Sequence, residues 1–147
     1  MIEINPEDAL CMNEVDTLTH KMNIQNEQIL QDFKTYLQDN GLAPKTIDRH
    51  VSNIDFYINN YLLYDDIENP EAGHYRLDDF FCDFFPRKAM WSSENSVKEN
   101  ITSLKKFYKY QNECSLVSDE DLNSMLDVIK VEKNNWMSLY NDEFDLL

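Results

Sequence analysis

The chain has 147 residues and a formal net charge of −15, a size that fits one domain able to bury a core without disulfides or bound metals. Hydrophobic residues make up 42% and aromatic residues 12%, which argues against a disordered chain despite the charge. Only two glycines and four prolines occur, too few for the repeated tight turns of a sheet, so we expect an all-helical protein.

Residues 1–24 are acidic and weakly patterned, and we interpret them as an N-terminal arm or a short helix. Asn5 followed by Pro6 is typical of a helix start, because proline is tolerated in the first turn. The pattern sharpens at Asn26, which we predict to cap the first main helix. This helix ends at Gly41 and carries its apolar side chains on one face: Leu30, Phe33 and Leu37.

A second helix is predicted to begin at Pro44, with apolar residues spaced by three and four: Ile47, Val51, Ile54, Tyr57 or Ile58, and Tyr61. Asn69, Pro70 and Gly73 then indicate a loop. A short helix follows, and its phenylalanines belong mainly to the core: Leu77, Phe80, Phe81, Phe84 and Phe85. We expect Pro86 to end this helix.

Ser92 or Ser93 is predicted to cap the next helix, whose buried face is narrow: Val97, Ile101, Leu104 and Tyr108. Ser118, with Asp121 three residues later, resembles a capping box for a further helix. Its inner face comprises Leu122, Met125 or Leu126, and Ile129. Residues 25–132 are therefore expected to form a compact bundle of four to five main helices.

Residues 133–147 are a last acidic segment, which either docks as a helix or frays. This segment contains Trp136 and Phe144. We interpret Trp91 and Trp136 as packing anchors in preference to ligand platforms, because large aromatic side chains dominate core energetics.

The three cysteines, Cys11, Cys82 and Cys114, are odd in number and far apart, so we expect free buried thiols in a reducing compartment, the cytoplasm. No cysteine or histidine lies two to four residues from another, so no metal site is predicted. His50 falls on the inner face of the second helix and is interpreted as a hydrogen-bonded core residue. Neither a secretory signal nor a long apolar run is recognised, so we expect no membrane contact.

Several stretches carry a family resemblance. Phe33 to Leu37 (FKTYL), Gly41 to Ile47 (GLAPKTI) and Ile54 to Tyr57 (IDFY) resemble the start of the SAM-like N-terminal core-binding domain of phage integrases, the tyrosine recombinases. Val97 to Tyr110, which contains the run LKKFY, is similar to the fourth helix of that domain. The resemblance implies a SAM-like helical bundle. Ala43 departs from the family, which usually places a serine or threonine cap there.

The resemblance covers about residues 26 to 126 and ends where the catalytic domain of that family would begin. That domain supplies an arginine pair, histidines, a lysine and a nucleophilic tyrosine. Here the only arginines, Arg49, Arg76 and Arg87, are far apart along the chain, and none of the eight tyrosines lies in a recognisable nucleophile context. We therefore expect a protein that is not an enzyme and needs no cofactor.

In that family the second and fourth helices cross the duplex, so the resemblance implies phosphate contacts by five residues: Lys45, Arg49, Lys98, Lys105 and Lys109. Spacings of seven and four place the last three in one stripe beside the buried helix face. A solvated helix flank is the other interpretation of this stripe. Residues 86–110 hold six basic and two acidic side chains, so the basic region is an island in an acidic chain.

Two functional hypotheses follow. The leading one is a non-catalytic core-binding-like domain of a mobile element that binds double-stranded DNA weakly, or binds a recombinase or another basic protein. The alternative is an acidic protein-interaction or inhibitor module, a DNA mimic that does not bind DNA. Its acidic blocks are Asp78-Asp79, Asp119-Glu120-Asp121 and Asp142-Glu143. The sequence leaves the oligomeric state and any DNA sequence preference open.

Overall fold

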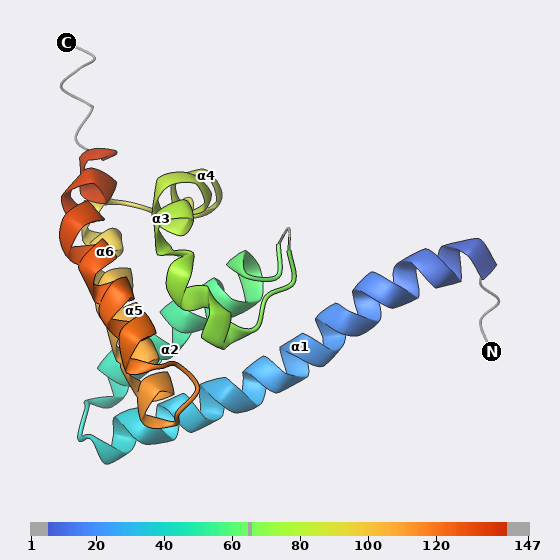
Figure 1. Ribbon diagram of the computed structural model, residues 1–147, viewed down its shortest axis with the longest axis horizontal. Helices are drawn as coiled ribbons and strands as arrows, with labels where there is room; N and C mark the ends of the chain where they lie inside the picture. The colour runs from blue at the N-terminus through green and yellow to red at the C-terminus, as the bar shows by residue number, and fades with distance from the viewer. Residues whose placement is uncertain (1–5, 65, 141–147) are drawn as a thin grey trace, which may run out of the picture.

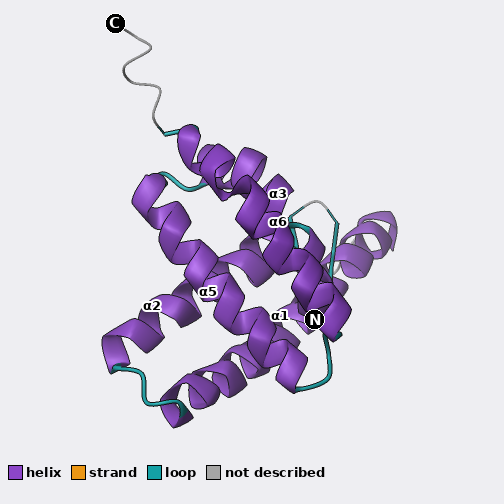
Figure 2. Ribbon diagram, turned by 60° about the vertical axis from the view of Figure 1, so that its left-hand side comes forward, coloured by secondary structure: helices purple, strands orange, loops and turns teal. Residues whose placement is uncertain are grey.

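The computed structural model describes residues 6–64 and 66–140, with side chains from residue 14 onward, and over these residues the chain is all-helical without strands (Figures 1 and 2). The labels η1 and η3 denote π-helical turns, and η2 denotes a 3-10 helix. In chain order the elements are α1 (Pro6–Asp39), α2 (Pro44–Asp55), η1 (Phe56–Tyr61), η2 (Pro70–Tyr75), α3 (Leu77–Asp79), η3 (Phe80–Phe84), α4 (Phe85–Lys88), α5 (Glu94–Glu113) and α6 (Asp119–Ser138). The predicted helical bundle is thereby confirmed.

Helix α1 runs without a break from Pro6 to Asp39, so the predicted helix start at Asn26 is wrong. Asn26 is fully buried, and its Nδ2 donates to Asn59 Oδ1 at 2.8 Å. Its polar side chain therefore serves a tertiary contact instead of a cap. The described part of the predicted arm belongs to α1, whose N-terminal half projects from the body (Figure 1). Asn5 lies outside the described residues.

The turn between α1 and α2 follows the sequence prediction. Gly41 adopts a φ of +79°, a left-handed conformation that glycine tolerates without strain. The N–H of Leu42 donates to the carbonyl oxygen of Leu37 at 3.3 Å and so satisfies an end of α1. Helix α2 begins at Pro44, and Ala43 caps it without any side-chain hydrogen bond.

The core is built around two π-helical turns that face each other, η1 and η3. The ring of Phe80 lies 4.8 Å from that of Tyr57 and 5.1 Å from that of Tyr61, measured between centroids. A π-helical turn adds one residue to a helix and widens it. Both stretches thereby present aromatic rings to a common centre, as the phenylalanine pattern predicted.

Pro86 does not end the short helix as predicted, because α4 continues to Lys88. The proline lies in the first turn of α4, directly after the π-helical turn η3. In a first turn the missing N–H costs no hydrogen bond. The local change of helix type therefore accommodates the proline. The predicted loop at Asn69 to Gly73 is likewise more ordered than expected, since Pro70–Tyr75 forms η2.

Both predicted caps of the C-terminal helices are present. Ser93 Oγ accepts from the N–H of Ser96 at 3.1 Å, and Ser96 Oγ accepts from the N–H of Ser93 at 2.7 Å. Ser118 Oγ accepts from the N–H of Asp121 at 3.0 Å. Helices α5 and α6 therefore begin where the hydroxyl side chains predicted.

Trp136 docks the end of α6 onto the body. Its indole N–H donates to Asp78 Oδ1 at 2.8 Å, and its ring stacks on Phe81 with centroids 4.7 Å apart. The predicted last segment therefore begins as part of α6, and Phe144 lies outside the described residues. Trp91 is 58% exposed, so the interpretation as a packing anchor holds for Trp136 and is wrong for Trp91.

The thiols differ from expectation. Cys82 and Cys114 are free but exposed, which corrects the prediction of buried thiols, and the side chain of Cys11 lies outside the described part. Cys82 lies on the outer side of η3 beside Asp78, away from the phenylalanine face. Cys114 follows the last turn of α5, where the chain turns into solvent.

Candidate nucleic-acid interface

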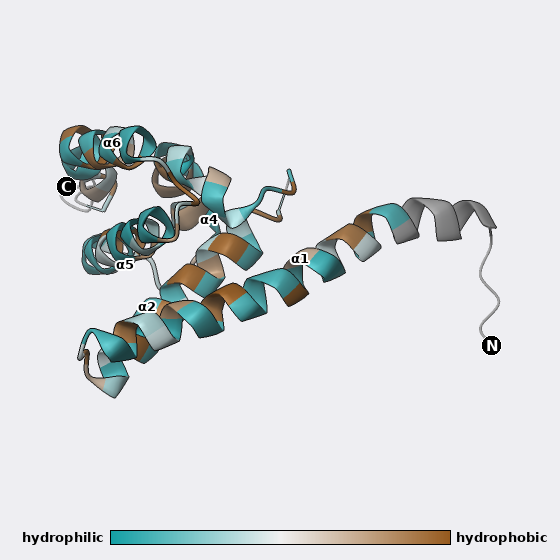
Figure 3. Ribbon diagram, turned by 60° about the horizontal axis from the view of Figure 1, so that its bottom comes forward, coloured by the Kyte–Doolittle hydropathy of each residue, from teal (hydrophilic) through white to brown (hydrophobic). Residues whose placement is uncertain are grey.

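Helices α2 and α5 pack side by side, which brings together the two helices that the resemblance assigned to DNA. His50 Nδ1 lies 2.7 Å from Ser103 Oγ, and Asn53 Nδ2 donates to the same oxygen at 3.0 Å. His50 is buried, as predicted for a core histidine, and its pKa is lowered by burial and then by the positive charges of Lys106 and Arg49. Figure 3 shows α6, α5 and α2 as successive layers.

The two basic candidates on α2 have different surroundings. Lys45 is exposed in the first turn of the helix. Arg49 is exposed one turn later, and its Nε lies 3.3 Å from Glu99 Oε1 on α5. The ion pair joins the two helices and neutralises part of the charge that Arg49 could offer to a phosphate.

The three lysine candidates on α5 lie on its outer side. Lys98 Nζ is 3.7 Å from Glu94 Oε1, an exposed pair one turn apart. Lys105 and Lys109 are also exposed, and neither forms an ion pair with any carboxylate among the described residues. The lysine stripe predicted from spacing is therefore present, and its C-terminal half carries unneutralised charge.

A hollow of about 170 Å³ lies beside this stripe and is lined by residues of both α5 and α6. Lys98 and Lys105 line it from α5, together with Lys133 from α6, and its apolar lining includes Ile101 and Met137. Sequence reasoning missed Lys133, because it placed this residue in an acidic tail. Only the docking of α6 brings its ammonium group to the same side of the molecule.

A second hollow, of about 270 Å³, lies at the other end of the stripe. Lys106 and Lys109 line it from α5, and Asn40 and Leu42 line it from the turn between α1 and α2. Lys106 was missed as a site residue, although its place in the run LKKFY was a signal. We group these basic side chains of α2, α5 and α6 under one name, the α5 basic face: Lys45 and Arg49 on α2, Lys98, Lys105, Lys106 and Lys109 on α5, and Lys133 on α6.

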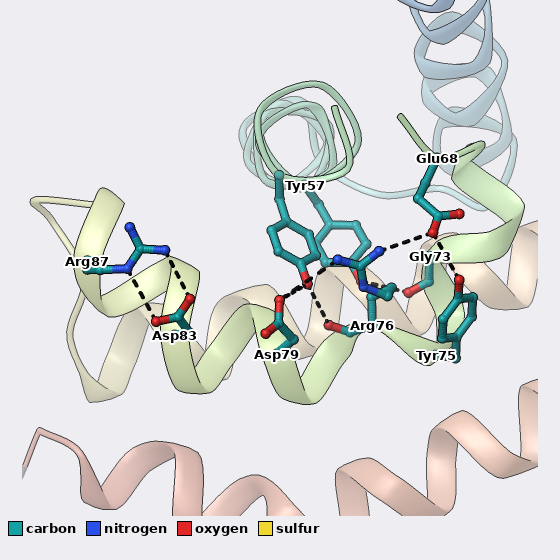
Figure 4. Close-up of polar contacts among 9 residues, drawn as sticks. Tyr57, Glu68, Gly73, Tyr75, Arg76, Asp79, Asp83 and Arg87 are labelled. Carbon is teal, nitrogen blue, oxygen red and sulfur yellow. Dashed lines mark hydrogen bonds and ion pairs between the residues drawn. The ribbon is translucent and has the colours of Figure 1, made fainter. Parts of the chain in front are cut away.

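A polar cluster around Arg76 lies elsewhere in the fold (Figure 4). Arg76 Nη1 is 3.1 Å from Glu68 Oε1, and Arg76 Nη2 is 3.9 Å from Asp79 Oδ2. The hydroxyl of Tyr61 donates to Asp79, and that of Tyr75 donates to Glu68 at 3.0 Å. These contacts tie η1, η2 and α3 together, so we assign the cluster to the stability of the fold.

Every described tyrosine whose pKa is shifted has a raised pKa and therefore stays protonated at neutral pH. Burial raises the pKa of Tyr57 and Tyr108 well above its ordinary value. Burial, together with a hydrogen bond to Glu113, raises the pKa of Tyr36 to about 12. A phenol with a raised pKa is protonated at neutral pH and acts as a hydrogen-bond donor.

Among the described residues, no group of three or more histidine, cysteine and acidic side chains is placed to hold a metal ion. No helix in the part of the chain that the structure describes is both long enough and apolar enough to cross a bilayer. Comparisons with protein-family models, with curated proteins and with solved structures found no match to this chain. The likeness to core-binding domains therefore rests on the stretches quoted above.

Proposed function

We propose that this protein is a non-catalytic DNA-binding domain that lays its α5 basic face along the phosphate backbone of a duplex. One observation carries the proposal: Lys105 and Lys109 are exposed side by side on α5 and form no ion pair with any described carboxylate. In a chain with a net charge of −15, such lysines are the groups most able to neutralise phosphates.

The resemblance to core-binding domains supports the same surface, because the two helices that it implies for DNA contact, α2 and α5, pack against each other. It also favours a mobile-element context, in which the domain acts beside a recombinase. Binding is expected to be weak, since most of the surrounding surface is acidic. Screening within about 10 Å at moderate salt limits that repulsion to short range.

The acidic alternative is less supported, because its described blocks serve the fold. Asp78 accepts from Trp136, and Asp79 pairs with Arg76. Asp119 and Asp121 lie in the first turn of α6, where carboxylates favour the helix terminus. The remaining block, Asp142-Glu143, lies outside the described residues. Four carboxylates of the two described blocks are thus used within the chain: Asp78, Asp79, Asp119 and Asp121.

The proposal is tested by fluorescence anisotropy with a labelled duplex, titrated from about 50 mM to about 200 mM salt. We expect Lys105→Glu with Lys109→Glu to weaken binding to every sequence and to reduce the salt slope by about 2, because two phosphate contacts are lost. The matched control is Arg87→Glu with Lys88→Glu, which changes net charge equally on α4. This control is expected to retain most of the affinity.

Two results would overturn the proposal. Equal weakening in both double variants would show that net charge alone matters and that the α5 basic face has no special part. Absence of binding by the unaltered protein at about 50 mM salt would exclude DNA as the ligand. The acidic protein-interaction module would then be the better account.

A further inference from the structure

A hollow of about 230 Å³ lies between the end of α2, the start of η1, the start of α5 and the segment before α5. Its lining includes Asn53, Asp55, Phe56, Trp91 and Asn100. None of these residues belongs to the α5 basic face. The residues that line this hollow combine aromatic rings with amide and carboxylate oxygens, and none of them is basic.

Two lining amides are oriented by the fold so that their oxygens are free. Asn100 is 3% exposed, and its Nδ2 donates to the carbonyl oxygen of Ser96 at 2.8 Å. A carbonyl can only accept, so this bond fixes which end of the amide is nitrogen. No described group donates to Asn100 Oδ1, and this oxygen is not among the solvent-inaccessible unpaired atoms. Its remaining access is through the hollow that the residue lines.

Asn53 repeats this arrangement. Ser103 Oγ donates to the carbonyl oxygen of Glu99 at 3.1 Å and therefore accepts from Asn53 Nδ2 at 3.0 Å. The amide nitrogen of Asn53 is engaged, and its oxygen receives no hydrogen bond from a described residue. Asp55 also lines the hollow and is exposed. Its Oδ1 accepts a hydrogen bond from Asn59 Nδ2 at 2.6 Å. The hollow is consequently rich in acceptors and carries one negative charge.

The aromatic side of the hollow is formed by Trp91 and Phe56. Their ring centroids lie 5.2 Å apart with an interplanar angle of 71°, so Phe56 supports the indole edge-on. Trp91 is 58% exposed and leaves indole surface open to solvent. An open tryptophan face attracts cations through its quadrupole, and the carboxylate of Asp55 lines the same hollow.

We propose that this hollow binds the arginine side chain of a basic protein partner. A guanidinium is planar, stacks on aromatic rings and presents five N–H donors, which matches the acceptors of Asn53, Asp55 and Asn100. The volume is below the roughly 300 Å³ at which small-molecule sites begin, so it suits one side chain. The α-carboxylate of free arginine would meet no basic lining residue. This interaction is independent of DNA binding.

The test follows the two indole N–H signals in a ¹H–¹⁵N NMR titration. The probe is N-acetyl-arginine methylamide, and its uncharged control is the corresponding citrulline compound. We expect the Trp91 signal to shift saturably, with a dissociation constant on the order of millimolar for so small a ligand. The buried indole of Trp136 is an internal reference and should not shift. The citrulline compound should leave both signals unchanged.

Variants then locate the site. Asp55→Asn keeps the shape of the side chain but removes its charge, and we expect affinity for the arginine probe to fall about tenfold. Asp48→Asn, on the same helix but outside the hollow, is the matched control and should bind normally. An unchanged Trp136 signal establishes that each variant is folded.

The inference would be overturned by equal shifts with the citrulline compound, by no shift with the arginine probe, or by unchanged affinity in Asp55→Asn. Free L-arginine is titrated in parallel. Tighter binding of the free amino acid than of the blocked probe would assign the hollow to a metabolite and remove the protein partner. All these readouts are independent of DNA affinity, so the two proposals fail separately.

Discussion

The hydroxyl of Tyr57 donates a hydrogen bond of 2.6 Å to the carbonyl oxygen of Gly73, and this contact anchors η2 to η1. Gly73 is enclosed, because a Cβ atom there would overlap the hydroxyl of Tyr108 and lie 2.8 Å from Leu62 Cδ1. The hydroxyl of Tyr108 is itself held by the carbonyl oxygen of Pro70 at 2.7 Å. The glycine is therefore required by close packing.

We predict that Gly73→Ala lowers the free energy of unfolding by about 2 kcal/mol, through overpacking against Tyr108 and Leu62. The control is Gly41→Ala, where nothing lies within 4 Å and only the left-handed φ opposes a side chain. This control should cost about 1 kcal/mol. Urea unfolding followed by tryptophan fluorescence measures both. A smaller loss at Gly73 than at Gly41 would contradict the packing argument.

Two leucines of α1 provide a matched pair for stability. Leu37 is 1% exposed, whereas Leu18 is 45% exposed on the projecting half of the helix (Figure 1). Leu37→Ala should cost about 3 kcal/mol because it leaves a cavity. Leu18→Ala should cost less than about 0.5 kcal/mol, as at most surface sites. Comparable midpoints in denaturant titrations of the two variants would show that the projecting half packs against the body.

Protonation of His50 is expected to destabilise the fold. Burial, followed by repulsion from Lys106 and Arg49, lowers the pKa of His50 below its ordinary 6.5. As pH falls through 6.5, His50 of the unfolded chain binds a proton, whereas His50 of the folded chain stays neutral until a lower pH. The contribution of neutral His50 to the free energy of unfolding is therefore complete above pH 6.5 and decreases as pH falls from 6.5 to the folded-state pKa. Thermal melting of His50→Gln between about pH 7 and pH 5 should show a smaller pH dependence than the parent. Parallel melting profiles would refute this role.

Loss of the carboxylate at Glu99 should strengthen DNA binding, if the proposed function holds. Glu99→Gln releases Arg49 from its 3.3 Å ion pair and removes the negative charge that neutralises this member of the α5 basic face. An exposed pair is worth less than about 1 kcal/mol, so we expect up to about a fivefold gain in affinity. Glu27→Gln on α1 matches the charge change away from that face. An equal gain in affinity in this control, measured by anisotropy, would show that Arg49 has no specific role in DNA binding.

The thiol of Cys82 should react slowly. The residue is largely exposed, but partial desolvation of its sulfur, and then a hydrogen bond and charge from Asp78, raise the pKa of the thiol to about 11, so little thiolate exists near neutral pH. Asp78→Asn retains an oxygen that accepts from Trp136 and removes the charge. We expect this variant to react several-fold faster with a disulfide reagent, in a background with Cys11 and Cys114 replaced by serine. Identical rate profiles against pH would contradict the assigned cause.

The helical fold and several helix boundaries follow from local sequence patterns alone. Ser93 and Ser118 cap α5 and α6, Gly41 ends α1 and Pro44 starts α2, as predicted. These features are local, because a hydroxyl, a glycine or a proline acts on backbone groups within one helical turn. The lysine spacing on α5 was predictable for the same reason, since helical geometry fixes which side chains share a face.

Which polar and aromatic residues lie inside the protein depends on how the helices pack. The sequence pattern predicts Asn26 to be a helix cap. In the structure it lies within the longer helix α1, where it is buried and bonded to Asn59. Trp91 and Trp136 are the same residue type, and only the position of each backbone makes one open and the other enclosed. Burial, and contacts between side chains distant in sequence, depend on how the helices pack. The residue pattern of one helix does not specify which other helices pack against it.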